Sequence, residues 1–225
     1  MTDEADVTGV TGETDVTDYE IADSAESWPV LESRVLARGG ITAYQEDLVL
    51  MVDGSRARRQ YTTHHGAVGV VVLDDEDRML TLRQYRHPVR RLLWELPAGL
   101  LDKQGEHPLA AAKRELYEEA HLQAAEWRVL VDYFNSSGTS DEATRIFAAR
   151  GVAAADGERF ALEGEEAGIV TRWVPVSEMV ERVLDGRVGT SSLAVAVCAL
   201  RAALTRPGGW DSLRPADAPW PARPF

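Results

Sequence analysis

The sequence predicts an α/β protein in which mixed β-sheets and helices form a layered sandwich, preceded by a small N-terminal β-domain. Three observations support this fold class. Short segments with strand-like patterns recur between residues 28 and 174, only three segments have the periodicity of helices, and strands rarely alternate with helices as β-α-β units. Because regular β-α-β alternation builds a doubly wound parallel sheet, its scarcity favours mixed sheets.

The first segment, residues 1–26, is expected to be a disordered acidic tail. It is rich in Asp, Glu, Thr and Gly and has few large apolar residues, so it cannot bury enough apolar surface to fold. The chain has 37 acidic and 24 basic residues and a net charge of −13, and ten of the acids lie in the first 33 residues. Such acidity argues against nonspecific binding to nucleic acid.

Residues 27–63 are expected to form the small β-domain, and residues 64–205 the main domain. In the first, Leu48–Val52 and Arg58–Thr62 have strand-like composition and flank Asp53–Ser55, a plausible turn. In the second, a turn at Asp74–Asp77 separates the first two of the expected strands. These strands are Ala67–Leu73, Met79–Gln84, Trp127–Tyr133, Thr144–Ala149 and Ile169–Val174.

Three helices complete the main domain. The first contains Pro108, which suits an initial helical turn, followed by an apolar stripe at spacings of three and four: Leu109, Ala112, Leu116 and Ala120. The second is expected to be capped by Ser177 and to end before Gly186, and the third spans about Ser191–Leu204. Residues 206–225 hold five of the ten prolines and two tryptophans, and should form an irregular C-terminal tail on the surface.

The composition favours a cytoplasmic protein. The sequence has no apolar run near the roughly 18 residues that suggest a membrane span, and its acidic N-terminus is unlike a secretory signal, so no membrane partner is expected. Cys198 is the only cysteine, which excludes an intrachain disulfide and suits a reducing compartment. Within its apolar run, we interpret Cys198 as a small core residue.

Residues 106–119 form the most informative motif. Glu106 and the run Arg114–Glu119 follow a glycine loop, Pro97–Leu101. Glu115 and Glu119 are four residues apart, so they lie one above the other on the expected helix. Stacked carboxylates repel one another, but they can share a hard divalent cation such as Mg²⁺, which prefers oxygen ligands and is often shared with substrate phosphates. The alternative is an ordinary solvated acidic helix face.

This motif resembles the Nudix box, in which a glycine and a glutamate precede an Arg-Glu-aliphatic-x-Glu-Glu run. Glu106, seven further residues and Arg114–Glu119 match the box in register. Six residues separate Gly99 from Glu106 instead of five, and His121 replaces the box glycine. That glycine would end the helix in the left-handed conformation, which His can adopt at a modest cost.

A narrower resemblance is to the ADP-ribose pyrophosphatase subfamily, particularly its actinobacterial members. It is carried by Gln84–His87, Arg90–Asp102 and the loop Ser137–Glu142. The resemblance implies the Nudix α/β/α sandwich over residues 64–205, and hydrolysis of ADP-ribose to AMP and ribose 5-phosphate with Mg²⁺, or with Mn²⁺ as the alternative. It also implies a homodimer in which residues 27–63 cross to the partner.

The resemblance also implies roles for ten residues. The metal ligands would be Glu115, Glu119 and the Ala98 carbonyl. Glu118 would be a further ligand or would orient one, and Arg114 would hold a neighbouring glutamate. The alternative for Arg114 is a simple surface ion pair with Glu118.

Glu142 would be the general base, on a loop that could close over substrate. Arg86 is expected to contact phosphate, because a guanidinium group suits phosphate oxygens. Glu95 is placed near the terminal ribose, with an ion pair to Arg90 or Arg91 as the alternative. The loop residues Gly99 and Leu100 complete the substrate site.

Three further side chains have simpler interpretations. His64 and His65 could suggest a metal pair, but we interpret them as the entry to a strand, and Trp94 as a core residue.

Competing functions are other Nudix reactions, on a different ADP-sugar, NADH or a diadenosine polyphosphate. A non-enzymatic ADP-ribose sensor is a further alternative. It is disfavoured because the box acids are intact and no room remains for a DNA-binding domain.

Overall fold

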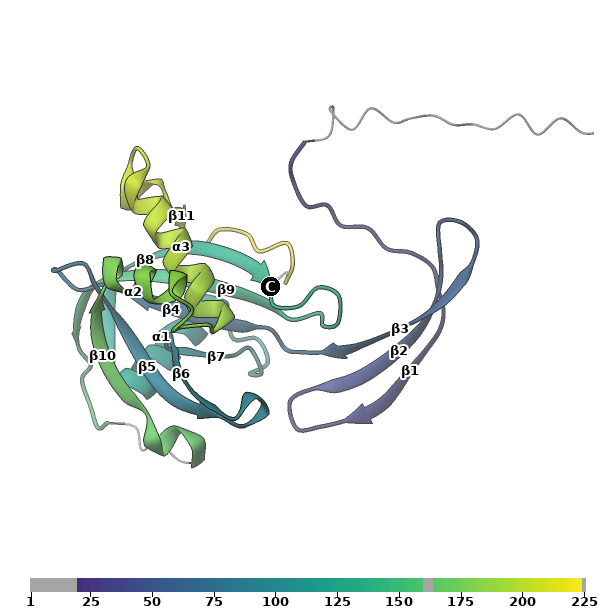
Figure 1. The fold of residues 1–225 in the computed structure, drawn as a ribbon, viewed down its shortest axis with the longest axis horizontal. Helices are drawn as coiled ribbons and strands as arrows, with labels where there is room; N and C mark the ends of the chain where they lie inside the picture. Colours follow the sequence, from purple (N-terminus) through teal and green to yellow (C-terminus); the bar gives the residue numbers. More distant parts are fainter. Residues whose placement is uncertain (1–19, 160–163, 224–225) are drawn as a thin grey trace, which may run out of the picture.

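The computed structural model of the chain describes residues 20–159 and 164–223. Most of the expected acidic tail therefore lies outside the described residues. An N-terminal sheet stands apart from the rest of the chain (Figure 1). It is antiparallel, in the order β1-β2-β3, with strands Val30–Arg38, Ala43–Leu50 and Arg56–Thr63. The expected turn joins β2 to β3, and Gly54 there has a φ of 79° that favours glycine.

This N-terminal sheet contains almost no hydrophobic core of its own. Every residue of β1 is exposed, and the two buried residues in the sheet are Ala43 and Glu46. Glu46 is held by Arg34, Arg58 and Gln60 at 2.8, 2.8 and 2.6 Å. Polar contacts therefore organise the sheet, and the apolar side chains of β1 are exposed.

The main body contains two further sheets. The larger has the order β11-β8-β9-β4-β7, with strands Arg214–Pro215, Leu122–Phe134, Ala143–Ala154, Ala67–Val72 and Ala98–Leu100. It is mixed, because β4 and β9 are parallel while its other pairs are antiparallel. The smaller sheet is antiparallel in the order β10-β5-β6, with strands Val170–Pro175, Arg78–Arg86 and Arg91–Glu95.

Helices cover both faces of the larger sheet. Helix α1 (Pro108–Ala120) packs on the face that includes Val70 and Val72 of β4. Helices α2 (Val176–Leu184) and α3 (Ser191–Thr205) pack with Val71 on the other face. Short 3₁₀ helices span His87–Val89, Gly164–Gly168 and Gly209–Ser212. The expected α/β sandwich of mixed sheets is confirmed (Figure 1).

Two sequence-based expectations about local structure were wrong. Helix α2 begins at Val176 with Pro175 as its N-cap, so Ser177 lies inside the helix instead of capping it. Cys198 is exposed, because the buried face of α3 is formed by Leu193, Ala196, Val197, Leu200 and Ala203, and Cys198 lies away from that face.

The C-terminal residues are irregular, but they are less superficial than expected. Trp210 and Trp220 are only 8% and 5% exposed. Among the described residues, no helix is long and apolar enough to cross a membrane.

Candidate active site

One cavity of about 720 Å³ gathers all ten residues that the sequence singled out for chemistry. Its walls come from β7, α1, β5, β6 and the start of β9, so residues far apart in the sequence meet there. The ten are Arg86, Glu95, Ala98, Gly99, Leu100, Arg114, Glu115, Glu118, Glu119 and Glu142.

Helix α1, which carries the carboxylates, has a histidine cap at each end. Its N-cap is His107, whose Nδ1 accepts a hydrogen bond from the Leu109 N–H at 3.3 Å. Its C-cap is His121, with φ 54° and ψ 43°. The His121 N–H donates to the carbonyls of Leu116 and Tyr117. His121 thus adopts the left-handed conformation expected of the box glycine, and the helix ends where the motif predicts.

Arg114 binds three of the glutamates in the 106–119 motif. Its Nε and Nη2 donate to the two carboxylate oxygens of Glu106, both at 2.9 Å, and its Nη1 donates to Glu115 at 2.6 Å and Glu118 at 2.9 Å. These bonds raise the pKa of Arg114 and lower that of Glu106. Arg114 therefore does more than form a simple surface pair with Glu118: it orders three glutamates at once.

Strand β7 and helix α1 interlock through two close contacts. Glu119 is only 4% exposed, and its Oε2 accepts a hydrogen bond from the Ala98 N–H at 2.9 Å. A Cβ placed on Gly99 would overlap the carboxyl group of Glu115. Gly99 is thus needed because the side chain of Glu115 passes directly over its backbone.

The donors in this cavity suit a hard divalent cation in type. Glu115, Glu118, Glu119 and the backbone of Ala98 all line it, and carboxylate and carbonyl oxygens are what Mg²⁺ and similar ions prefer. Within residues 20–159 and 164–223, however, no three acidic, His or Cys side chains converge into a ready ligand set. A cation would therefore compete with Arg114 for Glu115 and Glu118.

A second charged pair lines the same cavity. Arg86 Nη2 lies 2.6 Å from Glu95 Oε2, and Gln84 donates to the same oxygen at 3.0 Å. Glu95 is buried, whereas the side chain of Arg86 is 43% exposed. The alternative of a pair between Glu95 and Arg90 or Arg91 was wrong, because the Glu95 carboxylate is bound by the guanidinium group of Arg86.

Glu142 lies at the end of a loop that connects β8 to β9. The Glu142 carbonyl accepts a hydrogen bond from the Asn135 N–H at 3.1 Å, and its N–H donates to Ser140 Oγ at 3.1 Å. Its carboxylate lies 3.8 Å from the His64 ring. The loop is therefore closed by its own hydrogen bonds, and Glu142 lines the cavity.

Several lining residues were not found from the sequence. Asn135 Nδ2 donates to Thr144 Oγ1 at 3.1 Å, and Ser191 and Ser192 contribute the start of α3. None belongs to a dense motif, and only the folded chain brings them to the carboxylates. Lys103, in the loop before α1, adds a cation to the lining.

Comparison with known proteins agrees with this geometry. A model of the NUDIX domain matches residues 63–191, which is more than half of the chain. This chain belongs to the Nudix family. Nudix hydrolases generally use divalent metal ions, so the chain is a hydrolase of a metal-using family.

Two relatives and one solved structure set the context. An ADP-ribose pyrophosphatase of Mycobacterium tuberculosis is 41% identical over 194 residues, covering 86% of this chain and 91% of that protein. An ADP-ribose pyrophosphatase of Bacillus subtilis is 33% identical, over 56% of this chain and 67% of that protein. A crystal structure of an ADP compounds hydrolase covers 80% of this chain and 96% of its own with a TM-score of 0.64, and at 20% identity it shows the shared fold.

Replacing the Nudix-box Gly99 by alanine should lower turnover at least about tenfold, as losses around metal ligands do. The added methyl group must push the Glu115 carboxyl group away from its place over β7. Stability should change by less than about 1 kcal/mol, since the backbone of Gly99 is not in the left-handed region and a flexible side chain can yield. Steady-state kinetics and thermal unfolding measure both effects.

The matched control is Gly168→Ala, because an added Cβ there meets nothing within 4 Å. It should leave both turnover and stability unchanged. Normal turnover in the Gly99 variant would mean that Glu115 is not needed in this position.

The Arg114–Glu106 pair should make stability depend on pH. Arg114 lowers the pKa of Glu106 below its ordinary 4.5. The folded state therefore binds fewer protons than the unfolded state, and the stabilisation, complete above pH 4.5, is lost as the pH falls through the lowered pKa. Wild type should be more stable than Glu106→Gln near about pH 6, and the difference should shrink toward about pH 3.5. Urea unfolding at both pH values measures the difference in the free energy of unfolding between wild type and Glu106→Gln. A difference that is the same at both pH values would contradict the pairing.

Proposed function

We propose that this protein hydrolyses the pyrophosphate bond of ADP-ribose, with Mg²⁺ as its cation, to give AMP and ribose 5-phosphate. One observation carries the proposal. A single cavity brings three glutamates of α1 together with Arg86 and Glu142, which supplies cation ligands, a phosphate contact and a proton acceptor. The 41% identical mycobacterial relative, which is named for ADP-ribose, supports this choice of substrate.

The chemistry requires charge neutralisation and a base. A pyrophosphate is anionic, and water attacking its phosphorus must lose a proton. A cation held by Glu115, Glu119 and the Ala98 carbonyl, with Glu118 beside them, would neutralise phosphate charge and acidify bound water. Glu142 accepts the proton of the attacking water. Arg86 presents its guanidinium group to the phosphates, and Glu95 and Gln84 hold that group in place.

The test is a substrate panel. Purified protein is incubated with Mg²⁺ and ADP-ribose, another ADP-sugar, NADH or a diadenosine polyphosphate, and the products are separated by chromatography. ADP-ribose should be hydrolysed fastest, and exhaustive chelation should abolish the reaction. Full activity after chelation would overturn the mechanism. Faster hydrolysis of another compound would change the substrate and keep the fold and the cation site.

Mn²⁺ is the alternative cation, and parallel titrations with both ions decide between them. The reaction is placed in the cytoplasm, because a chain with one cysteine suits a reducing compartment. We propose no nucleic-acid or membrane partner. The alternative function, a non-enzymatic ADP-ribose sensor, predicts that no compound in the panel is hydrolysed.

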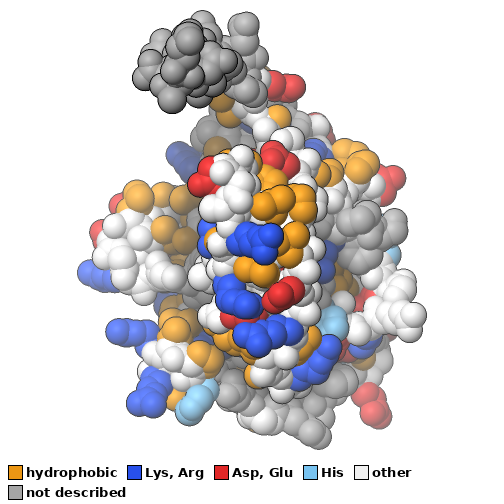
Figure 2. Space-filling model, turned by 90° about the vertical axis from the view of Figure 1, so that its right-hand side faces the viewer, with side chains coloured by type: hydrophobic (Ala, Val, Ile, Leu, Met, Phe, Trp, Pro, Cys, Tyr) orange, Lys and Arg blue, Asp and Glu red, His pale blue; other side chains and the backbone are white. Residues whose placement is uncertain are grey.

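A homodimer is proposed, with residues 27–63 packed against the partner. Val30, Leu31, Val35 and Leu36 of β1 are 51, 45, 41 and 40% exposed, although β1–β3 form a regular sheet. Figure 2, viewed from the side of this sheet, shows hydrophobic side chains gathered on the surface beside arginine or lysine. An apolar sheet too small to bury its own core gains stability by packing against a second copy.

The dimer should dissociate when β1 is made charged. Val35→Asp with Leu36→Asp places two carboxylates on the exposed β1, and light scattering at micromolar concentration should then report a monomer. Val52→Asp is the control, because Val52 is 83% exposed at a turn beyond the strands. A wild-type protein that is itself monomeric under these conditions would refute the dimer.

A further inference from the structure

The C-terminal residues Arg214–Arg223, which we call the C-terminal strap, run beside β8 toward the loop that carries Glu142. The strap starts as β11, paired with β8. Arg145, only 2% exposed, then donates to the carbonyls of Ala218 and Pro219 at 2.7 and 2.9 Å, and its guanidinium group lies 4.9 Å from the ring of Trp220. The strap is thereby fixed to β9 just before its last residues.

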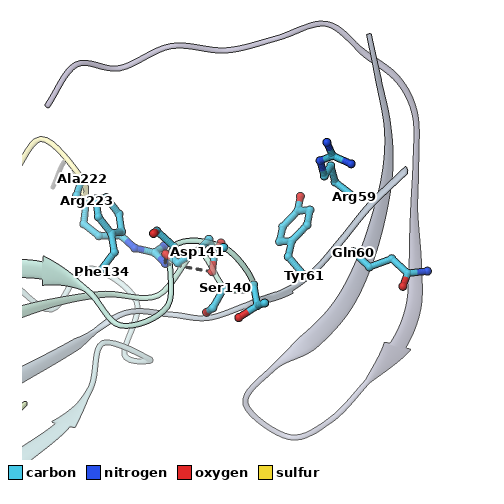
Figure 3. A pocket seen from close by; sticks show the side chains of 11 residues that line it. Arg59, Gln60, Tyr61, Phe134, Ser140, Asp141, Ala222 and Arg223 are labelled. Atoms are coloured by element: carbon cyan, nitrogen blue, oxygen red, sulfur yellow. Dashed lines mark hydrogen bonds and ion pairs between the residues drawn. The ribbon is translucent and has the colours of Figure 1, made fainter. Parts of the chain in front are cut away.

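At the end of the strap, Arg223 binds two peptide groups, one of which lies in the loop that carries Glu142. Its Nη2 donates to the carbonyl of His64 at 2.6 Å and to the carbonyl of Asp141 at 3.3 Å, and lies 3.8 Å from the Asp141 carboxylate. Figure 3 shows the Arg223 side chain reaching toward Asp141 and Ser140. The approach is close, because a Cβ on Gly66 would lie 3.3 Å from Arg223 Nε.

The two segments that Arg223 joins both contact Glu142. The Asp141 carbonyl belongs to the peptide unit that links Asp141 to Glu142, so a bond to it restrains the direction of the Glu142 side chain. The Asp141 carboxylate accepts the His64 N–H at 2.8 Å, and the His64 ring lies 3.8 Å from the Glu142 carboxylate. Thr62 adds backbone bonds to Thr139 and Asp141 at 2.9 and 3.2 Å.

We propose that Arg223 is a positioning residue, which fixes the peptide groups of His64 and Asp141 and so holds the Glu142 carboxylate in the cavity. The inference rests on the proposed role of Glu142 as the base. Arg223 lines a neighbouring cavity of about 600 Å³ and is not among the residues around the α1 carboxylates, so it acts through the loop. The C-terminal strap is then part of the active-site scaffold.

Arg223→Ala should lower kcat roughly tenfold with little change in KM, as losses of groups that orient an active residue do. Arg223→Lys should lower kcat less than Arg223→Ala does. An ammonium group can still donate to one carbonyl, although it lacks the planar arrangement of donors in a guanidinium group. The matched control is Arg206→Ala. Arg206 is an exposed arginine whose side chain bonds only Ser212 within the described residues, and its loss should leave kcat unchanged. Normal kcat in Arg223→Ala would overturn the inference.

A double variant separates positioning from general damage. When Glu142 is already glutamine, Arg223→Ala should lower kcat by less than about a further twofold. The effects of substitutions at residues that act as a unit are not additive. A second full tenfold loss in that background would show that Arg223 acts independently of Glu142 and would refute the proposal.

Hydrogen exchange of residues 135–143 gives a readout that needs no substrate. Exchange should be faster in Arg223→Ala and unchanged in Arg206→Ala. If no compound in the panel is hydrolysed, the proposed function fails, and this exchange still decides whether Arg223 holds the loop. Equal exchange in wild type and Arg223→Ala would contradict the anchoring.

Discussion

Glu142→Gln should lower kcat by about 10²–10⁴-fold while KM changes little, because a general base acts chiefly in the transition state. Glutamine keeps the size of the side chain but cannot accept a proton from water at neutral pH. The backbone of residue 142 would keep its bonds to Asn135 and Ser140, so the loop should stay closed. The loss is therefore expected in chemistry and not in folding.

The decisive measurement is kcat as a function of pH for wild type and variant. The kcat of the variant should lie at least about 10²-fold below that of wild type near neutral pH. Glu126→Gln is the control, since Glu126 is exposed on β8 and belongs to the same pair of strands. A variant that keeps more than about a tenth of kcat falls short of the usual contribution of a base. Glu118, Glu165 or Glu166 would then be the next candidates.

Glu119→Gln should reduce turnover by at least about 10–100-fold, by analogy with the losses seen when groups around a metal are removed. Glu119 is 4% exposed and accepts the Ala98 N–H at 2.9 Å, and a glutamine carbonyl can accept the same bond. The fold should therefore persist. Removing one charge also relieves repulsion from Glu115 and Glu118, so thermal stability without cations should not fall.

Cation affinity gives a second readout for Glu119. Titration calorimetry with Mg²⁺ or Mn²⁺ should show weaker binding in Glu119→Gln than in wild type. Glu126→Gln serves again as the control for loss of a carboxylate alone. Near-normal rates at saturating Mg²⁺, together with unchanged affinity, would show that Glu119 is not a ligand.

Local spacing explains why α1 and its motif could be predicted. Pro108 at the start, the apolar stripe and the Arg114–Glu119 run all act within one helix, so their period alone places the carboxylates together. His121 could likewise be assigned to the helix end, because the left-handed cap is a local backbone property. The mixed α/β class followed from counting elements in the same way.

Pairing between strands could not be predicted from the sequence. The turn at Asp74–Asp77 suggests that Ala67–Leu73 and Met79–Gln84 pair with each other. Instead, β4 joins the larger sheet and β5 the smaller one, and an isolated bridge links Leu73 to Met79. Strand β6 was not anticipated, and it decides that Glu95 pairs with Arg86. Such pairings depend on which apolar faces are buried together, which short-range patterns do not encode.

The sequence by itself determined the carboxylate helix, the glycine loop before it and the class of chemistry, because these depend on residue type and spacing over about a dozen positions. Only the tertiary structure decided that Arg86, Glu95 and Glu142 face those carboxylates, that Cys198 lies outside the core, and that the C-terminal strap reaches Glu142's loop. The physical reason is distance along the chain. Arg223 and His64 are 159 residues apart, and only the packed sheets bring their hydrogen-bonding groups within reach.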